Sequence, residues 1–141
     1  MSLLNVFDIA GTALSAQTVR LNTTASNMAN ANSASSSSES TYRARYPVFS
    51  TAMLEQWNFD AADHAPRGVR IDGIVESEAA LKREYSPNHP LADTDGYITL
   101  PNVNVVEEMA NMISASRSYQ SNIEIMEASK QLLQQTLSLG Q

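Results

Sequence analysis

The chain has 141 residues, a formal net charge of −6 and no cysteine. This length suits one domain, or one small domain with extensions, and the lack of cysteine excludes disulfides and thiolate metal sites. We expect no nucleic-acid partner, because phosphates reward clustered basic residues and the 9 Lys and Arg are scattered. The apolar stretches are too short for a membrane span, which needs roughly 18 apolar residues. No basic residue precedes Arg20, so we expect no cleaved signal peptide.

Apolar and small residues recur three and four apart over 1–32, which keeps one face of a helix aligned with a partner helix. This stripe consists of Leu4, Phe7, Gly11, Leu14, Thr18, Leu21, Ala25 and Met28. A helix from about Asn5 to Asn30 would be roughly 40 Å long. Its only charged residues are Asp8 and Arg20, whereas a solvated helix shows Glu, Lys and Arg to water. We therefore expect the N-terminal helix to be covered by neighbours on several sides.

The middle part, 33–101, carries most of the charge: ten of the fifteen acidic and six of the nine basic residues. It opens with a serine-rich tract, Ser33 to Ser40, which predicts a flexible linker or loop. Alternation at Val69 and Ile71, followed by Asp72-Gly73, is typical of a strand or of a hairpin with its turn at that dipeptide. Further short strands are expected within Tyr42–Leu54, Leu81–Tyr85 and Tyr97–Leu100. We predict a small β-rich insert.

The last part, 102–141, predicts one long helix. Asn104 is a suitable N-cap, and Glu107 can complete a capping box. No Pro or Gly interrupts Val105–Leu139, and Gly140 follows as a stop. The apolar stripe consists of Val105, Met109, Met112, Ser116, Tyr119, Ile123, Met126, Lys130, Leu133 and Leu137. Arg117 lies on an otherwise uncharged face, so it is either solvated or paired with an acid on a neighbouring helix.

The predicted fold class is α+β, with the two long terminal helices packed as an antiparallel coiled-coil-like pair and the small β-rich insert between them. The insert is too small to shield both stripes and their uncharged flanks. We therefore expect other subunits to cover them. The candidate assembly-interface residues are Leu4, Phe7, Leu14, Leu21, Asn27, Met28, Asn30, Met109, Met112, Arg117, Tyr119, Asn122, Ile123, Met126, Leu133 and Leu137.

Catalytic and metal sites are not indicated. His64 and His89 lie in polar, proline-flanked segments, where histidine is usually a surface group. Asp93-Thr94-Asp95-Gly96 resembles part of a calcium loop, but Leu91 and Asn102 occupy the positions that demand Asp and Glu. We interpret that segment as a tight turn. The sequence has no glycine-rich phosphate loop or nucleophile elbow, and we expect no cofactor, metal or catalytic residue.

Two sets of residues resemble bacterial flagellar basal-body rod proteins. The N-terminal set, 4–11, 20–22 and 25–31, includes an Asn-x-x-Asn-Ala element at Asn27 that flagellar axial proteins share broadly. A narrower set resembles the proximal-rod branch of that family. It comprises Tyr85-Ser86-Pro87-Asn88-His89-Pro90-Leu91-Ala92-Asp93 through Gly96-Tyr97, Pro101-Asn102-Val103-Asn104, Glu108-Met109 and Ala115-Ser116-Arg117-Ser118-Tyr119.

The resemblance implies a non-enzymatic structural subunit that self-associates helically to form the proximal rod in the periplasm. It also implies export through the flagellar type III apparatus without signal cleavage. The implied neighbours are the rod proteins FlgB, FlgF and FlgG and the adaptor FliE. Two other classes stay open: a soluble coiled-coil adaptor or chaperone-like binding module, and a small β-domain enzyme with helical arms. The adaptor predicts charges flanking the apolar seam, which the N-terminal helix lacks.

Overall fold

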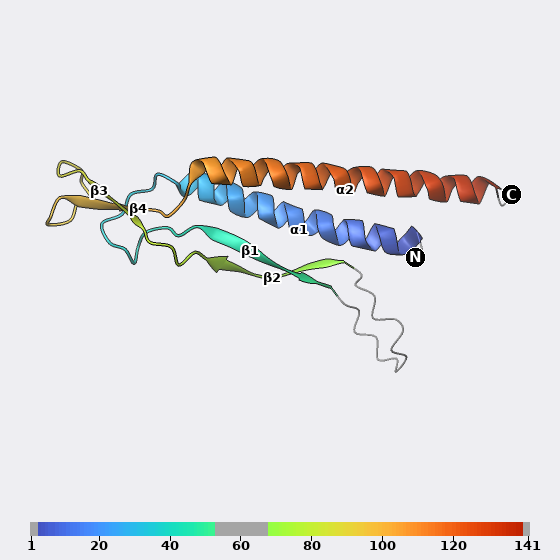
Figure 1. Ribbon diagram of the computed structural model, residues 1–141, viewed down its shortest axis with the longest axis horizontal. Helices are drawn as coiled ribbons and strands as arrows, with labels where there is room; N and C mark the ends of the chain where they lie inside the picture. Colours follow the sequence, from blue (N-terminus) through green and yellow to red (C-terminus); the bar gives the residue numbers. More distant parts are fainter. Residues whose placement is uncertain (1–2, 53–67, 140–141) are drawn as a thin grey trace, which may run out of the picture.

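The computed structural model describes residues 3–52 and 68–139. Its elements are α1 (Leu3–Asn30), β1 (Arg45–Thr51), β2 (Val69–Glu76), β3 (Lys82–Tyr85), β4 (Tyr97–Leu100) and α2 (Val105–Leu139). The helices run antiparallel and side by side, so both chain ends lie at the same end of the molecule (Figure 1). The α+β fold class with a paired set of terminal helices is confirmed.

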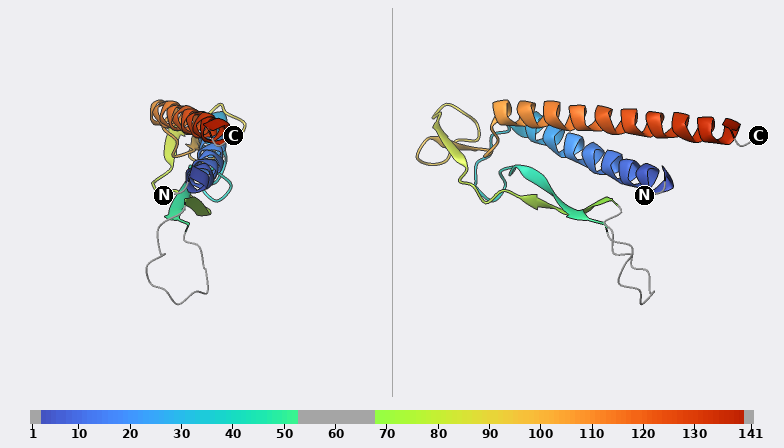
Figure 2. Two further views of the ribbon diagram at one scale, coloured as in Figure 1. Left: turned by 90° about the vertical axis from the view of Figure 1, so that its right-hand side faces the viewer. Right: turned by 45° about the vertical axis from the view of Figure 1, so that its right-hand side comes forward.

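The elements form three layers beyond which one small sheet projects. α1 lies between α2 and the antiparallel pair β1–β2, which we call the ribbon, as both views in Figure 2 show. β3 and β4 form a second two-stranded sheet past the inner end of the helix pair, where α1 ends and α2 begins. The described part of the molecule is therefore elongated, and each helix keeps a face that the other described elements leave open.

The start of α2 follows from its capping residues. The Val106 N–H donates to Asn104 Oδ1 at 3.2 Å, which confirms Asn104 as the N-cap. Glu107 and Glu108 occupy the first turn, where the helix dipole favours negative charge. Between described residues, the structure shows no hydrogen bond from Glu107 back to Asn104, so the capping box is not closed.

The ribbon corrects the expected turn at Asp72-Gly73. β2 continues through this dipeptide, and the register shifts there: Val48 pairs with Gly73 and Phe49 with Ile71. Asp72 is left as the extra residue of a β-bulge. A glycine inside a strand often marks such a bulge, and Gly73 has open space where a Cβ would lie. The two residues that suggest a turn in the sequence therefore bend a continuous strand.

The second sheet confirms two expected strands and the tight turn near them. β3 and β4 pair antiparallel from Lys82–Leu100 to Tyr85–Tyr97. The Asp93 side chain accepts hydrogen bonds from the backbone N–H groups of Asp95 and Tyr97 at 3.0 and 2.8 Å. Gly96 supplies the positive φ of 82° that such a turn favours.

The serine tract is a loop, as expected, but it is anchored. Ser35 and Thr99 exchange two backbone hydrogen bonds at 2.9 and 3.0 Å, so the loop lies against the edge of β4. Ser37 O accepts a hydrogen bond from the buried Thr41 hydroxyl at 2.7 Å. These contacts hold the segment that the sequence suggests is a flexible linker.

The core is thin and consists mainly of small side chains. The buried apolar residues among those described are Ala10, Ala16, Ala31, Ala44, Ile98, Pro101, Val103 and Ala115. One cluster forms where the helices meet the ribbon, and it joins Ala31, Ala44 and Val103 with the partly buried Tyr42. Since the large apolar residues lie mostly outside this core, much of their surface faces outward.

Candidate assembly surface

The buried line of α2 differs from the predicted stripe at alternate positions. It runs with spacings of four and three through Glu108, Met112, Ala115, Tyr119, Asn122, Met126, Ser129 and Leu133, which are buried or half-buried. Met112, Tyr119, Met126 and Leu133 belong to both lines. At the other positions the structure buries the neighbouring residue, which is mostly smaller or more polar. A small side chain such as Ala115 lets two helix backbones approach closely.

The residues of the predicted stripe that are displaced from this line are exposed or half-buried. Met109 is 51% exposed and Leu137 is 71% exposed, while Ile123 is half-buried beside the line. Arg117 is exposed and makes no salt bridge to any other described residue. Arg117 is therefore solvated within the described part of the subunit, and its pairing with an acid on a neighbouring subunit stays a prediction.

On α1 the large apolar residues flank a buried line of smaller ones. Phe7, Leu14, Leu21 and Met28 are half-buried, and the side chain of Leu4 lies outside the described residues. The buried positions are Ala10, Ala16, Thr23, Thr24 and Asn27. The exposed positions again repeat three and four apart: Asp8, Gly11, Ser15, Thr18, Asn22, Ala25 and Ala29. The outward face of α1 is thus narrow, small-sided and almost uncharged.

The two candidate asparagines have different surroundings. Asn27 is 0% exposed and bonds to Glu108, Tyr42 and the Arg45 backbone. Asn30 is half-buried, and its side chain donates to the Ser26 carbonyl of its own helix at 2.8 Å. Asn27 therefore joins elements within the subunit, whereas Asn30 is bonded only locally.

A buried carboxylate lies beside Asn27 at the inner end of the helix pair. Glu108 is 1% exposed, and its Oε2 accepts a hydrogen bond from Asn27 Nδ2 at 3.0 Å. Its other oxygen has no hydrogen-bond partner among the described residues. Burial raises the pKa of the nearby Tyr46 phenol, and the negative charges of Glu108 and Glu107 raise it further. This polar group was missed in the sequence, because an acid in a first helical turn is normally explained by the helix dipole.

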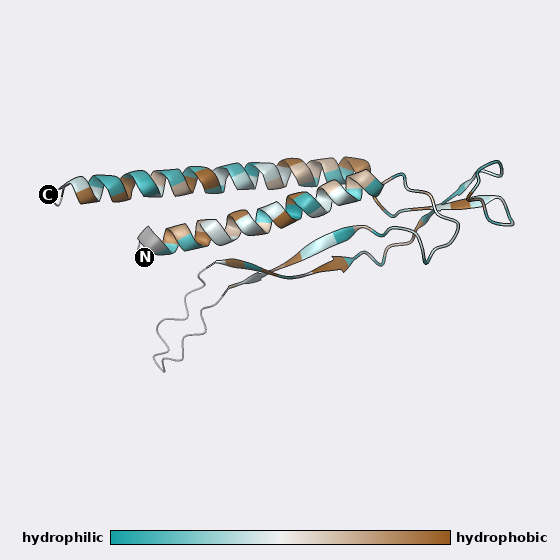
Figure 3. Cartoon of the chain, turned by 180° about the vertical axis from the view of Figure 1, so that it is seen from behind, coloured by the Kyte–Doolittle hydropathy of each residue, from teal (hydrophilic) through white to brown (hydrophobic). Residues whose placement is uncertain are grey.

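Large apolar residues of α2 and of the ribbon have exposed side chains, and Figure 3 shows brown, hydrophobic positions on both elements. On the first turns of α2, Val106 is 76% exposed and Ile113 is 56% exposed. Others with substantial exposure are Val48, Phe49, Ile74, Val75, Ile125 and Leu132. Extended apolar exposure of this kind marks surfaces that another chain covers. It is the main feature expected of a subunit in a larger assembly.

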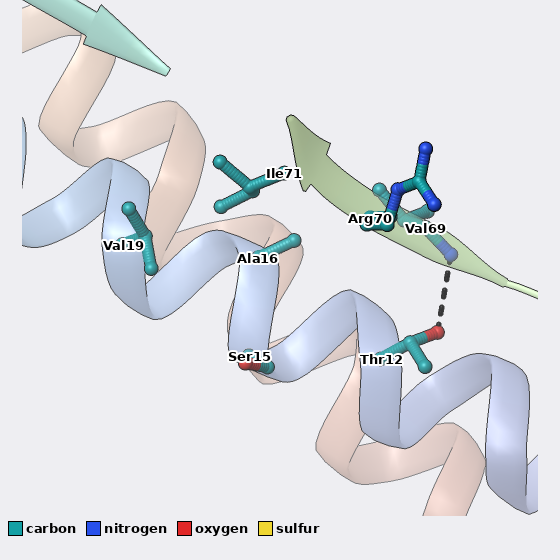
Figure 4. A pocket seen from close by; sticks show the side chains of 7 residues that line it. All are labelled: Thr12, Ser15, Ala16, Val19, Val69, Arg70 and Ile71. Carbon is teal, nitrogen blue, oxygen red and sulfur yellow. Dashed lines mark hydrogen bonds between the residues drawn. The ribbon is translucent and has the colours of Figure 1, made fainter. Parts of the chain in front are cut away.

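The ribbon touches α1 around an open hollow of about 300 Å³ (Figure 4). The hollow is lined by Thr12, Ser15, Ala16, Val19, Val69, Arg70 and Ile71. At one end the Val69 N–H donates to Thr12 Oγ1 at 3.2 Å. Gly68 has a φ of 153°, and a Cβ there would lie 2.4 Å from the same oxygen, so the close approach requires glycine.

The described part of the chain holds no group of three or more His, Asp or Glu placed to bind a metal. His89 accepts a hydrogen bond from the Leu91 N–H at 3.1 Å, and His64 lies outside the described residues. No described helix has an apolar stretch long enough to cross a bilayer.

Comparisons with known proteins agree with this interpretation. Residues 7–34, covering most of α1, match the family model described as flagella basal body rod protein. Residues 94–139, covering β4 and α2, match the model described as flagellar basal body rod FlgEFG protein C-terminal. The two matched segments are the parts that pair in the structure.

Curated relatives match over the full length. The chain is 49% identical to the flagellar basal-body rod protein FlgC of Salmonella typhimurium, over 100% of both chains. It is 48% identical to FlgC of Escherichia coli O157:H7 and 40% identical to FlgC of Buchnera aphidicola from Acyrthosiphon pisum, again over 100% of both chains. Their names describe these relatives as flagellar basal-body rod proteins. The chain therefore belongs to the FlgC family of flagellar basal-body rod proteins.

Proposed function

We propose that this subunit polymerises through the outward faces of its two helices and its ribbon to build the proximal part of the rod. One observation carries the proposal: the helix pair closes over small residues such as Ala115, while large apolar residues such as Ile113 remain outside. A protein that folded only for itself would bury the large side chains first, because burial stabilises in proportion to apolar area.

The neighbours we propose are further copies of this chain, the rod proteins FlgB, FlgF and FlgG, and the adaptor FliE. Support comes from α2, because the family model that matches it is described for FlgEFG proteins. Proteins with the same C-terminal helix can present similar faces to one another. We place the assembled subunit in the periplasmic rod, after export by the flagellar type III apparatus without a cleaved signal peptide.

The soluble adaptor is the weaker alternative. Adaptors that pair helices selectively carry charged residues beside the apolar seam to choose partners. The only charged residues of α1 are Asp8 and Arg20, and the Arg20 guanidinium donates a hydrogen bond to Asn111 Oδ1 at 3.4 Å. A nearly uncharged helix face suits permanent burial better than reversible recognition.

Complementation tests the proposed function. The chain is expressed in a flagellated bacterial species whose own corresponding rod gene has been deleted, which leaves the cells unable to swim. Swimming is then measured, and basal bodies are purified and examined. Restored swimming, with the protein present in the rod, is expected. Accumulation of the exported protein without any rod would contradict the proposal, and binding to a soluble partner in that case would favour the adaptor.

A further inference from the structure

The side chain of Asn27 uses its whole hydrogen-bonding capacity within the subunit. Nδ2 donates to the Arg45 carbonyl at 2.9 Å and to Glu108 Oε2 at 3.0 Å. Oδ1 accepts from the Arg45 N–H and from the Tyr42 hydroxyl, both at 2.9 Å. An amide has two donor hydrogens and two acceptor lone pairs, so all four are satisfied. We infer that Asn27 is the positioning residue that sets the direction in which the ribbon leaves the helix pair.

The two bonds to Arg45 carry this inference. Arg45 is the first residue of β1, and the Asn27 amide pairs with both its N–H and its carbonyl, as a neighbouring strand would. The third partner, Glu108, lies in the first turn of α2. One buried side chain therefore ties α1, α2 and β1 together where they converge, and it fixes their relative orientation at that point.

No similar side chain can make this set of contacts. Aspartate has the same shape but no donor, so its second oxygen would face the Arg45 carbonyl and the Glu108 carboxylate. Leucine has a similar size but neither donor nor acceptor. Either change would leave buried polar groups without partners, which costs more than the lost bond itself.

The direction of the ribbon matters because the rest of its attachment to α1 is sparse. Along α1 an open hollow separates the two, and the Thr12–Val69 hydrogen bond closes only one end of it. The ribbon also displays apolar residues, among them Ile74 and Val75 at 51% and 52% exposure. If these residues contact a neighbouring subunit, as the proposed function requires, a rotated ribbon would misplace them.

The test uses the full-length, unassembled subunit, so that its result does not depend on rod formation. Amide hydrogen exchange is measured at Arg45, whose N–H bonds to Asn27, and at Ser77, whose N–H bonds to the Ala44 carbonyl at 2.8 Å and reports on strand pairing. Small-angle scattering reports the overall shape. The variants are Asn27→Leu, Asn27→Asp and the double variant Asn27→Asp/Glu108→Gln, with Asn22→Asp, at an exposed position of α1, as the matched control.

Asn27→Leu removes the acceptor of the Arg45 N–H and should accelerate exchange at Arg45 by roughly tenfold, the equivalent of one lost hydrogen bond, with little change at Ser77 and an altered scattering profile. Asn27→Asp keeps that acceptor, so its faster exchange should come from repulsion between its second oxygen and the Arg45 carbonyl and Glu108 carboxylate. The double variant should recover part of the effect, because the introduced glutamine amide can donate to the introduced aspartate while the Arg45 carbonyl stays unpaired. Asn22→Asp should behave as the parent.

Normal Arg45 exchange and unchanged scattering in both single variants would overturn the inference. So would uniform loss of helix content in all Asn27 variants, including the double variant, because Asn27 would then only stabilise the core. If the parent subunit has a correctly docked ribbon but builds no rod, that result would contradict the proposed function and leave this inference intact.

Discussion

Ala115 gives the sharpest test of how the two helices meet. Its side chain is 0% exposed at the middle of the buried line of α2. Leucine would add three carbon atoms where the helices leave room for one methyl group, and overpacking of this kind costs about 1–3 kcal/mol. In a chain of this length 1 kcal/mol lowers the melting temperature by about 3–4 °C. We therefore expect Ala115→Leu to lower it by roughly 3–12 °C in thermal unfolding followed by circular dichroism.

The same substitution at an exposed alanine is the control. Ala110 lies on the open side of α2, so Ala110→Leu should change the free energy of unfolding by no more than about 0.5 kcal/mol. Met109→Ala should also be mild, because Met109 is 51% exposed. The opposite result would contradict the observed buried line and place it on the stripe predicted from the sequence. In that case Ala115→Leu would leave the free energy of unfolding unchanged, and Met109→Ala would lower it by about 2 kcal/mol or more, the cost of truncating a core Met.

Three further predictions concern other parts of the subunit, the first of them with its own control. Met112→Asp places a carboxylate in the buried line of α2, so it should lower the free energy of unfolding by several kcal/mol and abolish swimming. Glu78→Lys on the exposed loop is the control, and it should change the free energy of unfolding by only about 0.5 kcal/mol in denaturant titrations. The hydrogen bond from the Tyr97 N–H lowers the pKa of the Asp93 carboxyl group. The ionised Asp93 should therefore stabilise the β3–β4 turn above the ordinary carboxyl pKa, and this stabilisation should disappear as the pH falls through the lowered pKa. NMR titration of the turn measures this loss. Thr12→Val removes the acceptor of a ribbon N–H and should cost about 1 kcal/mol, with faster exchange of that amide.

The helices could be predicted from the sequence because their signals are local. Apolar spacing, the Asn104 N-cap and the absence of Pro or Gly up to Leu139 define α2 without reference to any other element. The register of the helix pair is a different kind of property. It depends on which residues allow two backbones to approach, and a small residue such as Ala115 carries little weight in a hydrophobic pattern.

The remaining differences arise from contacts that are distant in the sequence. The Asp72-Gly73 dipeptide is a bulge because β1 pairs across it. Ser35 is held because it meets β4 much later in the chain, at Thr99. The Asn-x-x-Asn-Ala element points to Asn27, but its four bonds could not be foreseen, because they depend on Arg45 and Glu108 converging on it.

If the outward apolar face of α2 builds the rod, one substitution on that face should block rod assembly. Ile113 is 56% exposed, so Ile113→Asp should leave the stability of the free subunit nearly unchanged. Basal bodies purified from cells that carry this variant as the sole copy should lack a complete rod, although the protein is made and exported. Complete rods containing the variant, at parental numbers per cell, would contradict the account.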